Sequence, residues 1–157
     1  MKSALRTAAL GLALVSGLTA TAGAQTHRMH IGPQIAYDFD IEEIGLGAQF
    51  SAPIVNRVEF YPSFMVYFVE PGSFWNVNAD IKWRVAKDRP NWLYVGGGLN
   101  VARASAAGNS NTDVGLNLLA GAESLKGRIH PFAEARLILA DGSRFQLGAG
   151  LNITLGH

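Results

Sequence analysis

Alternation of apolar and polar residues constrains this chain more than any other feature of its sequence. From position 29 onward, apolar side chains recur at every second residue in eight separate runs. The clearest run sets Trp75, Val77, Ala79, Ile81, Trp83 and Val85 against Asn76, Asn78, Asp80, Lys82 and Arg84. A period of two places successive side chains on opposite faces of a β-strand. The pattern therefore predicts eight β-strands, each with one apolar and one polar face.

The spacing of the runs predicts how the strands connect. They cover residues 29–38, 44–52, 57–68, 75–85, 93–101, 114–123, 129–139 and 144–155. Most connections are short and contain turn-forming residues, and the one longer loop is expected at 104–112. Short connections join antiparallel neighbours, and eight such strands leave no free edge once they close. We therefore expect an all-β fold, an eight-stranded antiparallel up-and-down barrel.

The first 24 residues have a different character. Met1–Arg6 carries two positive charges, Thr7–Leu18 is apolar, and Ala22-Gly23-Ala24 has the small-x-small pattern that signal peptidase accepts. A transmembrane helix needs about 20 apolar residues, more than this run offers. We expect residues 1–24 to be a cleaved signal peptide and residues 25–157 to form one barrel domain. The alternative is a single N-terminal anchor helix.

The direction of the polar face separates a membrane barrel from a soluble one. A soluble barrel that binds a hydrophobic ligand turns its apolar face inward, whereas an outer-membrane barrel turns it toward lipid. Glycines gather on the polar face, where they relieve crowding in a narrow lumen but would weaken a water-facing strand. They are Gly32, Gly45, Gly47, Gly96, Gly98, Gly115, Gly121, Gly148 and Gly150. We therefore predict a transmembrane barrel with a polar lumen.

The polar face also carries matched charges. Its acids are Asp38, Glu59, Asp80, Glu123 and Glu134, and its bases are Arg57, Lys82, Arg84, Arg136 and Arg144. Charges enclosed together need partners, whereas charges on a water-facing surface do not. We predict that these ten residues form a charge network in the lumen. The alternative is a solvated face on which the balance is coincidental.

The turn at residues 70–73 suggests a register for the strands on either side of it. If Phe68 lies opposite Trp75, then Glu59 lies opposite Arg84. The same register places Tyr61 beside Lys82 and Ser63 beside Asp80. We therefore expect Glu59 and Arg84 to form an ion pair across the lumen.

Two late segments carry a resemblance to known proteins. They are His130–Leu137 (HPFAEARL) and Arg144–Leu151 (RFQLGAGL). This pair resembles the last strands of outer-membrane β-barrel families that include outer-membrane protein A and the small opacity-like proteins. The resemblance implies a location in the outer membrane of a Gram-negative-type envelope. Such proteins usually end in an aromatic residue, whereas this chain ends in Leu155-Gly156-His157.

Several kinds of chemistry are excluded or unsupported. The chain has no cysteine, which rules out disulfides, a lipoprotein anchor and cysteine zinc sites. Its net charge of +1 includes no basic stripe for nucleic acid. None of its four histidines pairs with a serine in a nucleophile–base pattern, and Gly96-Gly97-Gly98 lacks the Lys-Ser/Thr of a phosphate loop. We predict no enzymatic activity, no cofactor and no bound metal.

Three classes of function remain open. The leading one is a structural or interaction protein of the outer membrane whose lumen is plugged by paired charges. The second is a narrow pore for ions or small solutes, and the third is a soluble periplasmic barrel that binds a hydrophobic ligand. We expect a monomer in contact with outer-membrane lipid, without a nucleic-acid partner, and with surface contacts through loop 104–112.

Overall fold

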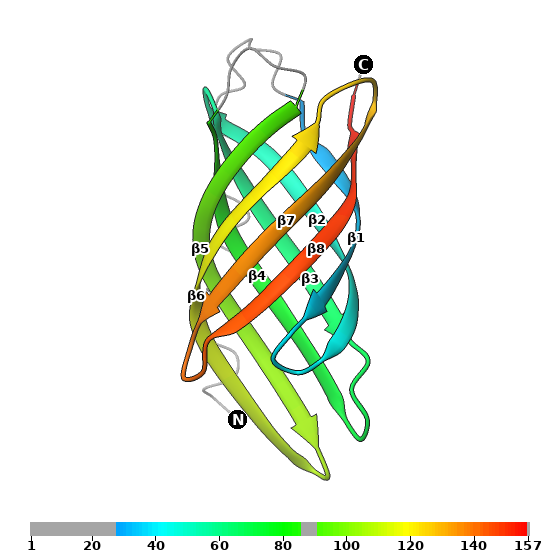
Figure 1. Ribbon diagram of the computed structural model, residues 1–157, viewed down its shortest axis with the longest axis vertical. Coiled ribbons are helices and arrows are strands. Elements are labelled where there is room, and N and C mark those ends of the chain that lie inside the picture. The colour runs from blue at the N-terminus through cyan, green and yellow to red at the C-terminus, as the bar shows by residue number, and fades with distance from the viewer. Residues whose placement is uncertain (1–27, 86–90, 157) are drawn as a thin grey trace, which may run out of the picture.

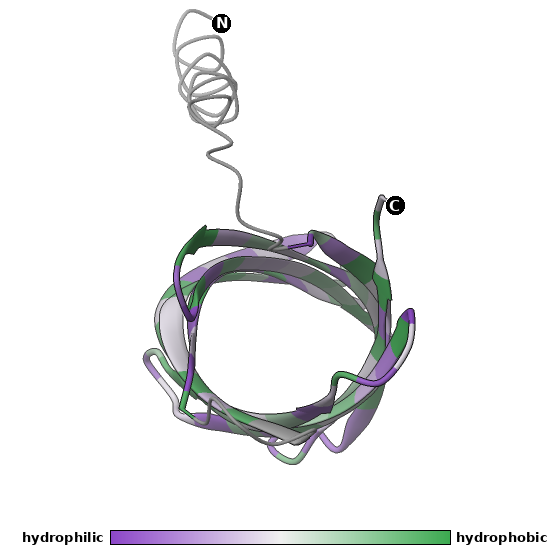
Figure 2. Cartoon of the chain, turned by 90° about the horizontal axis from the view of Figure 1, so that it is seen from above, coloured by the Kyte–Doolittle hydropathy of each residue, from purple (hydrophilic) through white to green (hydrophobic). Residues whose placement is uncertain are grey.

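Eight strands follow one another along the chain and close into a barrel (Figure 1). They are β1 (His30–Asp38), β2 (Glu43–Val55), β3 (Val58–Tyr67), β4 (Ser73–Arg84), β5 (Asn91–Ala106), β6 (Asn109–Ser124), β7 (Ile129–Leu139) and β8 (Arg144–Thr154). This computed structural model describes residues 28–85 and 91–156. Each strand pairs antiparallel with the next, and β1 pairs with β8 to complete the ring seen in Figure 2. The predicted up-and-down barrel is confirmed.

The predicted signal peptide, residues 1–24, lies outside the described residues. Within residues 28–85 and 91–156, no helix is long and apolar enough to cross a membrane.

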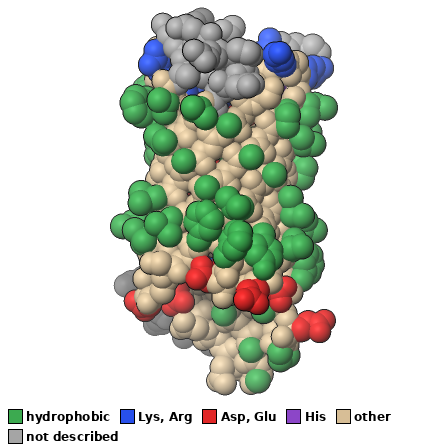
Figure 3. All heavy atoms as spheres, viewed as in Figure 1, with side chains coloured by type: hydrophobic (Ala, Val, Ile, Leu, Met, Phe, Trp, Pro, Cys, Tyr) green, Lys and Arg blue, Asp and Glu red, His purple; other side chains and the backbone are tan. Residues whose placement is uncertain are grey.

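The apolar face of each strand points outward. On β4, Val77 and Ile81 are 42% and 41% exposed. The intervening Asn78 and the following Lys82 are only 2% and 1% exposed, because they point into the lumen. On the face seen in Figure 3, apolar side chains form a band between a rim of basic and a rim of acidic side chains. A barrel with this polarity presents its exterior to lipid, so the predicted direction of the faces is confirmed and a soluble barrel with an apolar interior does not fit.

Glycines on the inner face leave room for large lumen side chains. A Cβ atom on Gly45 would lie 2.7 Å from the ring of Tyr67, and one on Gly150 would lie 2.6 Å from the ring of Phe132. Both distances are shorter than any van der Waals contact between carbon atoms. The narrow lumen therefore holds its aromatic residues only because the facing positions are glycine.

The register of β3 and β4 corrects the predicted one. Tyr67 pairs with Phe74, and Glu59 pairs with Lys82 instead of Arg84. Tyr61 lies opposite Asp80, and Ser63 lies opposite Asn78. The centre of the β3–β4 turn thus lies one residue earlier than predicted. Beside this turn, the ring centroids of Tyr67 and Phe74 are 5.3 Å apart. Alternation could not reveal this difference, because a shift of two residues in pairing leaves every side chain on the same face.

The predicted loop at 104–112 is wrong. β5 extends to Ala106 and β6 begins at Asn109, so only Ala107 and Gly108 form the turn. Their φ angles of 48° and 82° are those of a type I′ turn, whose twist suits a two-residue hairpin. Residues 104–112 carry only small or polar side chains on both faces, because they project beyond the apolar band. In this part of the barrel β6 has no β7 partner before Leu116. Strand structure therefore continues where the alternation has ended.

The two ends of the barrel differ. β1 begins and β8 ends at the end that also carries the β2–β3 and β6–β7 turns, here named the terminal end (Figure 1). The β5–β6 hairpin projects from the opposite end, here named the hairpin end.

Candidate functional site

Two cations and two anions meet in the lumen near the terminal end, in a group named here the terminal-end cluster (Glu59, Lys82, Arg84 and Glu123). Arg84 Nε donates to Glu59 Oε1 at 2.5 Å, and Arg84 Nη2 donates to Glu123 Oε2 at 3.1 Å. Lys82 Nζ lies 3.9 Å from Glu59 Oε2 and 4.0 Å from Glu123 Oε2. Each carboxylate thus faces both cations, and the four charges balance. Such compensation is what buried charges require.

Hydrogen bonds extend this cluster into a circuit across the lumen. Glu123 accepts a bond from Asn152 Nδ2 at 2.9 Å, and Asn152 Oδ1 accepts one from Gln49 Nε2 at 3.0 Å. On the other side, the Ser51 hydroxyl donates to Glu59 Oε2 at 2.6 Å. The circuit therefore joins β2, β3, β4, β6 and β8. Several of these strands are not neighbours in the sheet, so their side chains meet inside the barrel.

Lys82 is also held by aromatic rings. Its Nζ atom lies 3.8 Å from the ring centroid of Tyr61 and 4.6 Å from that of Tyr94. Both distances are within the range of cation–π attraction. Tyr61 and Tyr94 also pack with Leu119 as a buried apolar group. At this level the lumen is filled by side chains.

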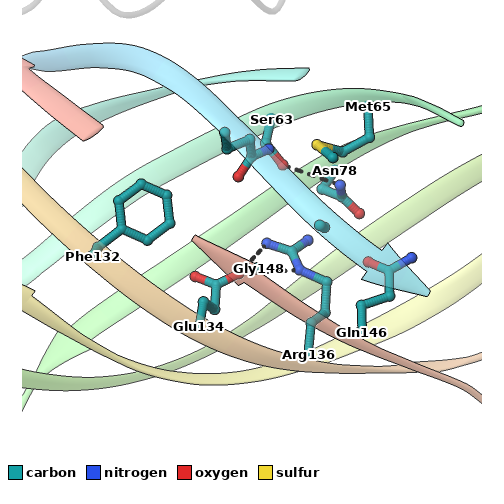
Figure 4. A pocket seen from close by; sticks show the side chains of 10 residues that line it. Ser63, Met65, Asn78, Phe132, Glu134, Arg136, Gln146 and Gly148 are labelled. Carbon is teal, nitrogen blue, oxygen red and sulfur yellow. Dashed lines mark hydrogen bonds and ion pairs between the residues drawn. The ribbon is translucent and has the colours of Figure 1, made fainter. Parts of the chain in front are cut away.

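A second group of charges lies deeper in the barrel and centres on Arg136 of β7. Arg136 Nη1 lies 2.8 Å from Asp80 Oδ2. Arg136 Nη2 donates to Glu134 Oε1 at 2.9 Å, and Figure 4 shows these two side chains together. The Tyr94 hydroxyl donates to the other Glu134 oxygen at 3.0 Å. Asn117 Nδ2 donates to the other Asp80 oxygen at 2.8 Å. Strands β4, β5, β6 and β7 are therefore linked through their lumen side chains.

A small cavity adjoins this second group. It measures about 20 Å³ and is lined by Gln34, Ala36, Ser63, Met65, Asn78, Phe132, Glu134, Arg136, Gln146 and Gly148 (Figure 4). This volume accommodates about one water molecule. Small-molecule sites usually need several hundred cubic ångströms, so the cavity does not suit such a ligand.

A third group of paired side chains lies in the lumen toward the hairpin end. Arg144 Nη1 lies 3.5 Å from Asp38 Oδ2, and the same carboxylate oxygen accepts a bond from Gln146 Nε2 at 2.8 Å. The guanidinium carbon of Arg144 lies 4.8 Å from the ring centroid of Phe74. Paired charges thus occur at three levels along the barrel axis.

Nine of the ten residues predicted for the charge network lie in the lumen and take part in these ion pairs. Glu59 and Arg84 meet as predicted, although Arg84 reaches Glu59 diagonally past Lys82. Arg57 is the exception. It occupies the β2–β3 turn with a φ of 70°, and no ion pair joins it to the described lumen residues. Arg57 precedes β3, which begins at Val58. The alternation of inward and outward side chains along the strand therefore does not extend to Arg57, and the prediction that it points inward fails.

Two lumen contacts were missed by sequence reasoning. The rings of His30 and His130 lie 5.0 Å apart, and His130 Nδ1 lies 3.5 Å from Glu123 Oε1. Asn78 Oδ1 accepts bonds from Asn100 and Asn117 at 2.7 and 2.9 Å. In both cases the only available signal was a polar residue at an inward position. Asn78 and Asn100 meet through the register of the neighbouring strands β4 and β5. The contacts between the two histidines and between Asn78 and Asn117 instead join strands that are not neighbours in the sheet.

Among the described residues, no three His, Cys, Asp or Glu side chains are placed so that they could hold a metal ion. The ionisable groups of the lumen instead bind one another.

Comparison with known proteins relates this barrel to others of the same size. No protein-family model matches the sequence, and no curated protein matches it. The N-terminal β-barrel domain of Pseudomonas aeruginosa OprF matches with a TM-score of 0.71 at 14% identity, over 81% of this chain and 96% of that one. Neisserial surface protein A matches with a TM-score of 0.61 at 16% identity, over 81% and 96%.

A third structure extends the comparison. Ail, the attachment invasion locus protein of Yersinia pestis, matches with a TM-score of 0.52 at 20% identity, over 80% of this chain and 97% of that one. At such low identities the likeness concerns the fold. Together with the apolar band of the exterior, that fold makes this chain a small eight-stranded outer-membrane β-barrel.

Proposed function

We propose that this protein is a structural or interaction component of the outer membrane and that its lumen is closed to steady ion flow. The observation that carries the proposal is the circuit from Gln49 through Asn152 and Glu123 to Arg84. An eight-stranded barrel has an interior only just wide enough for its own side chains. Side chains that bond across so narrow a space leave no continuous path for water.

The energetics of the terminal-end cluster support a closed lumen. To open a path, Arg84 would have to leave Glu59 or Glu123 while it remained inside the barrel. Breaking a buried ion pair costs about 3–5 kcal/mol. At about 3 kcal/mol an open arrangement is populated less than one per cent of the time, since each 1.4 kcal/mol is a factor of ten.

We propose that the barrel has no catalytic role. A nucleophilic hydroxyl needs a base within hydrogen-bond reach. The Ser51 hydroxyl does donate to a carboxylate, that of Glu59, but Arg84 and Lys82 already engage this carboxylate in ion pairs. The Ser63 hydroxyl accepts a bond from Asn78 and contacts no base among the described residues. The rings of His30 and His130 pack against each other at an angle of 54°. These contacts favour a packing role for the polar residues of the lumen.

We propose the tip of the β5–β6 hairpin as the surface for contacts outside the membrane. Nearly all of residues 104–112 are exposed. Two side-chain contacts stiffen the tip: Arg103 Nη2 donates to Ser110 Oγ at 3.1 Å, and Asn111 Nδ2 donates to Asp113 Oδ1 at 2.9 Å. A stiff, polar projection loses less conformational entropy on binding than a flexible loop does.

Conductance measurements in planar bilayers test the closed lumen. The wild-type protein should show negligible steady conductance. Replacing both carboxylates of the terminal-end cluster, by Glu59→Gln with Glu123→Gln, should raise conductance, because Lys82 and Arg84 then repel each other. Glu42→Gln, at the exposed rim, is the matched control and should leave it unchanged. Reproducible single-channel steps from the folded wild-type protein would overturn the proposal and favour a narrow pore.

A further inference from the structure

The two rims of the barrel carry exposed or half-buried charges of opposite sign. At the terminal end these are Arg28, Arg57, Lys126 and Arg128. At the hairpin end they are Asp40, Glu42, Glu43, Glu70, Asp113 and Asp141, against two bases among the described residues there, Arg103 and the half-buried Arg144, which pairs with Asp38 in the lumen. Basic side chains lie on one side of the apolar band and acidic side chains on the other (Figure 3). The rims therefore face the two membrane surfaces with opposite potentials.

Three of the basic residues gather around the end of β8. The Thr154 amide donates to the Arg128 carbonyl at 2.9 Å, and the Leu155 amide donates to the Met29 carbonyl at 2.8 Å. Arg128 and the Arg28–Met29 segment therefore flank β8 on its two sides. With strands about 4.8 Å apart, the two arginine backbones are about 10 Å from each other. Lys126 precedes Arg128 in the same turn.

An apolar surface adjoins these three cations on the lipid-facing side. Met29 is 50% exposed, Ile129 is 55% exposed, and Ile153 and Leu155 are 41% and 43% exposed. All four lie on the same three adjacent chain segments as Arg28 and Arg128. A cationic rim directly beside a lipid-facing apolar surface matches the layout of a phospholipid, whose phosphate adjoins its acyl chains.

We propose that Arg28, Lys126 and Arg128 form a binding site for the headgroup of an anionic phospholipid in the leaflet at the terminal end. Guanidinium groups bind phosphate oxygens through two parallel hydrogen bonds. Each Lys or Arg near an anionic membrane surface strengthens attraction about fivefold. No exposed acid among the described residues of this rim competes with the phosphate. The acidic rim at the hairpin end disfavours the same lipids.

Brominated lipids test this site, because bromine quenches tryptophan fluorescence only at close range. The full chain with Trp75→Phe, Trp83→Phe and Trp92→Phe provides a background without tryptophan. Ile129→Trp then reports from the lipid-facing surface beside the site, and Phe145→Trp reports from the hairpin end of β8. Both folded variants are placed in phosphatidylcholine vesicles that contain brominated phosphatidylglycerol or, for reference, brominated phosphatidylcholine.

The Ile129→Trp reporter should show an apparent affinity for phosphatidylglycerol about fivefold or more above that for phosphatidylcholine, and the Phe145→Trp reporter should show no such preference. Arg28→Gln, Lys126→Gln and Arg128→Gln together should abolish the preference at position 129. Arg57→Gln, on the same rim but outside the site, should preserve it.

Three results would overturn the proposal. The first is equal quenching of the Ile129→Trp reporter by the two lipids in the protein with its charges intact. This outcome does not depend on whether the triple variant folds. The second is a preference that survives the triple substitution in folded protein. The third is an equal preference for phosphatidylglycerol at the Phe145→Trp reporter, which would assign the preference to the barrel surface in general and not to this site.

Discussion

Lys82 illustrates how a single residue can keep a charge inside this barrel. Its side chain is 1% exposed, yet two carboxylates and two tyrosine rings surround its ammonium group. The carboxylates supply the opposite charge, and the rings supply the negative faces of their π-systems. A charge buried without such partners costs several kcal/mol. The partners of each lumen charge are therefore as important to stability as the charge itself.

Glu59→Ala should lower the free energy of unfolding by about 3 kcal/mol, because it leaves Lys82 and Arg84 with Glu123 as their shared carboxylate. Adding Arg84→Ala should recover part of that loss, since one cation then faces one anion. Urea titration of the protein folded in lipid vesicles measures both changes. The exposed Glu42→Ala should change stability by no more than about 0.5 kcal/mol. A Glu59→Ala loss equal to that of Glu42→Ala would contradict the role of the cluster.

At the scale of the strand, the outer and inner faces of the β3–β4 pair should respond unequally to substitution. Val77→Arg should cost about 2–4 kcal/mol in a bilayer, because its side chain meets hydrocarbon. On the neighbouring strand, Ser63→Ala should cost about 1 kcal/mol, because it removes one lumen hydrogen bond from Asn78. Unfolding titrations in vesicles compare the two. Similar costs would argue against a lipid-facing Val77.

The β5–β6 hairpin offers a test of its turn. Ala107 has a φ of 48°, a conformation that alanine adopts only at a cost of about 1 kcal/mol. Ala107→Asn should therefore stabilise the hairpin by about 0.5–1 kcal/mol and slow amide hydrogen exchange in residues 104–112. Gly108→Val, at a φ of 82°, should do the opposite. Unchanged exchange in both variants would contradict the type I′ turn.

Sequence reasoning located the strands more reliably than it located their partners. The period of two identified β7 at its observed bounds and the inward direction of Glu134 and Arg136. It missed the pairing of Arg136 with Asp80, because β7 and β4 are far apart in sequence and meet only across the lumen. Such contacts depend on strand tilt and stagger, which no local pattern encodes. The tip of the β5–β6 hairpin was missed for a different reason. Residues 104–112 are small or polar on both faces, so the sequence shows no alternation there.

At the scale of the whole molecule, the fold and the predicted signal peptide lead to expectations for how the protein behaves in cells. The mature chain should begin at Gln25 and fractionate with the outer membrane, as N-terminal sequencing and membrane separation would measure. Before boiling it should migrate differently on a denaturing gel than after boiling, because a closed barrel leaves detergent no strand edge to open. Recovery in the soluble periplasmic fraction would contradict the membrane assignment.

The lumen circuit has a consequence for the order of assembly. Glu123 on β6 receives its bonds from Arg84 on β4 and from Asn152 on β8, and Asn152 in turn binds Gln49 on β2. If only the first six strands had inserted, Glu123 and Gln49 would lack their partner Asn152 on β8. They would then face lipid on the open side of the sheet, where polar and charged groups are costly. A partly inserted intermediate is thus destabilised by the same residues that stabilise the closed barrel. Insertion and closure are therefore expected to proceed as a single cooperative step, completed when β8 meets β1.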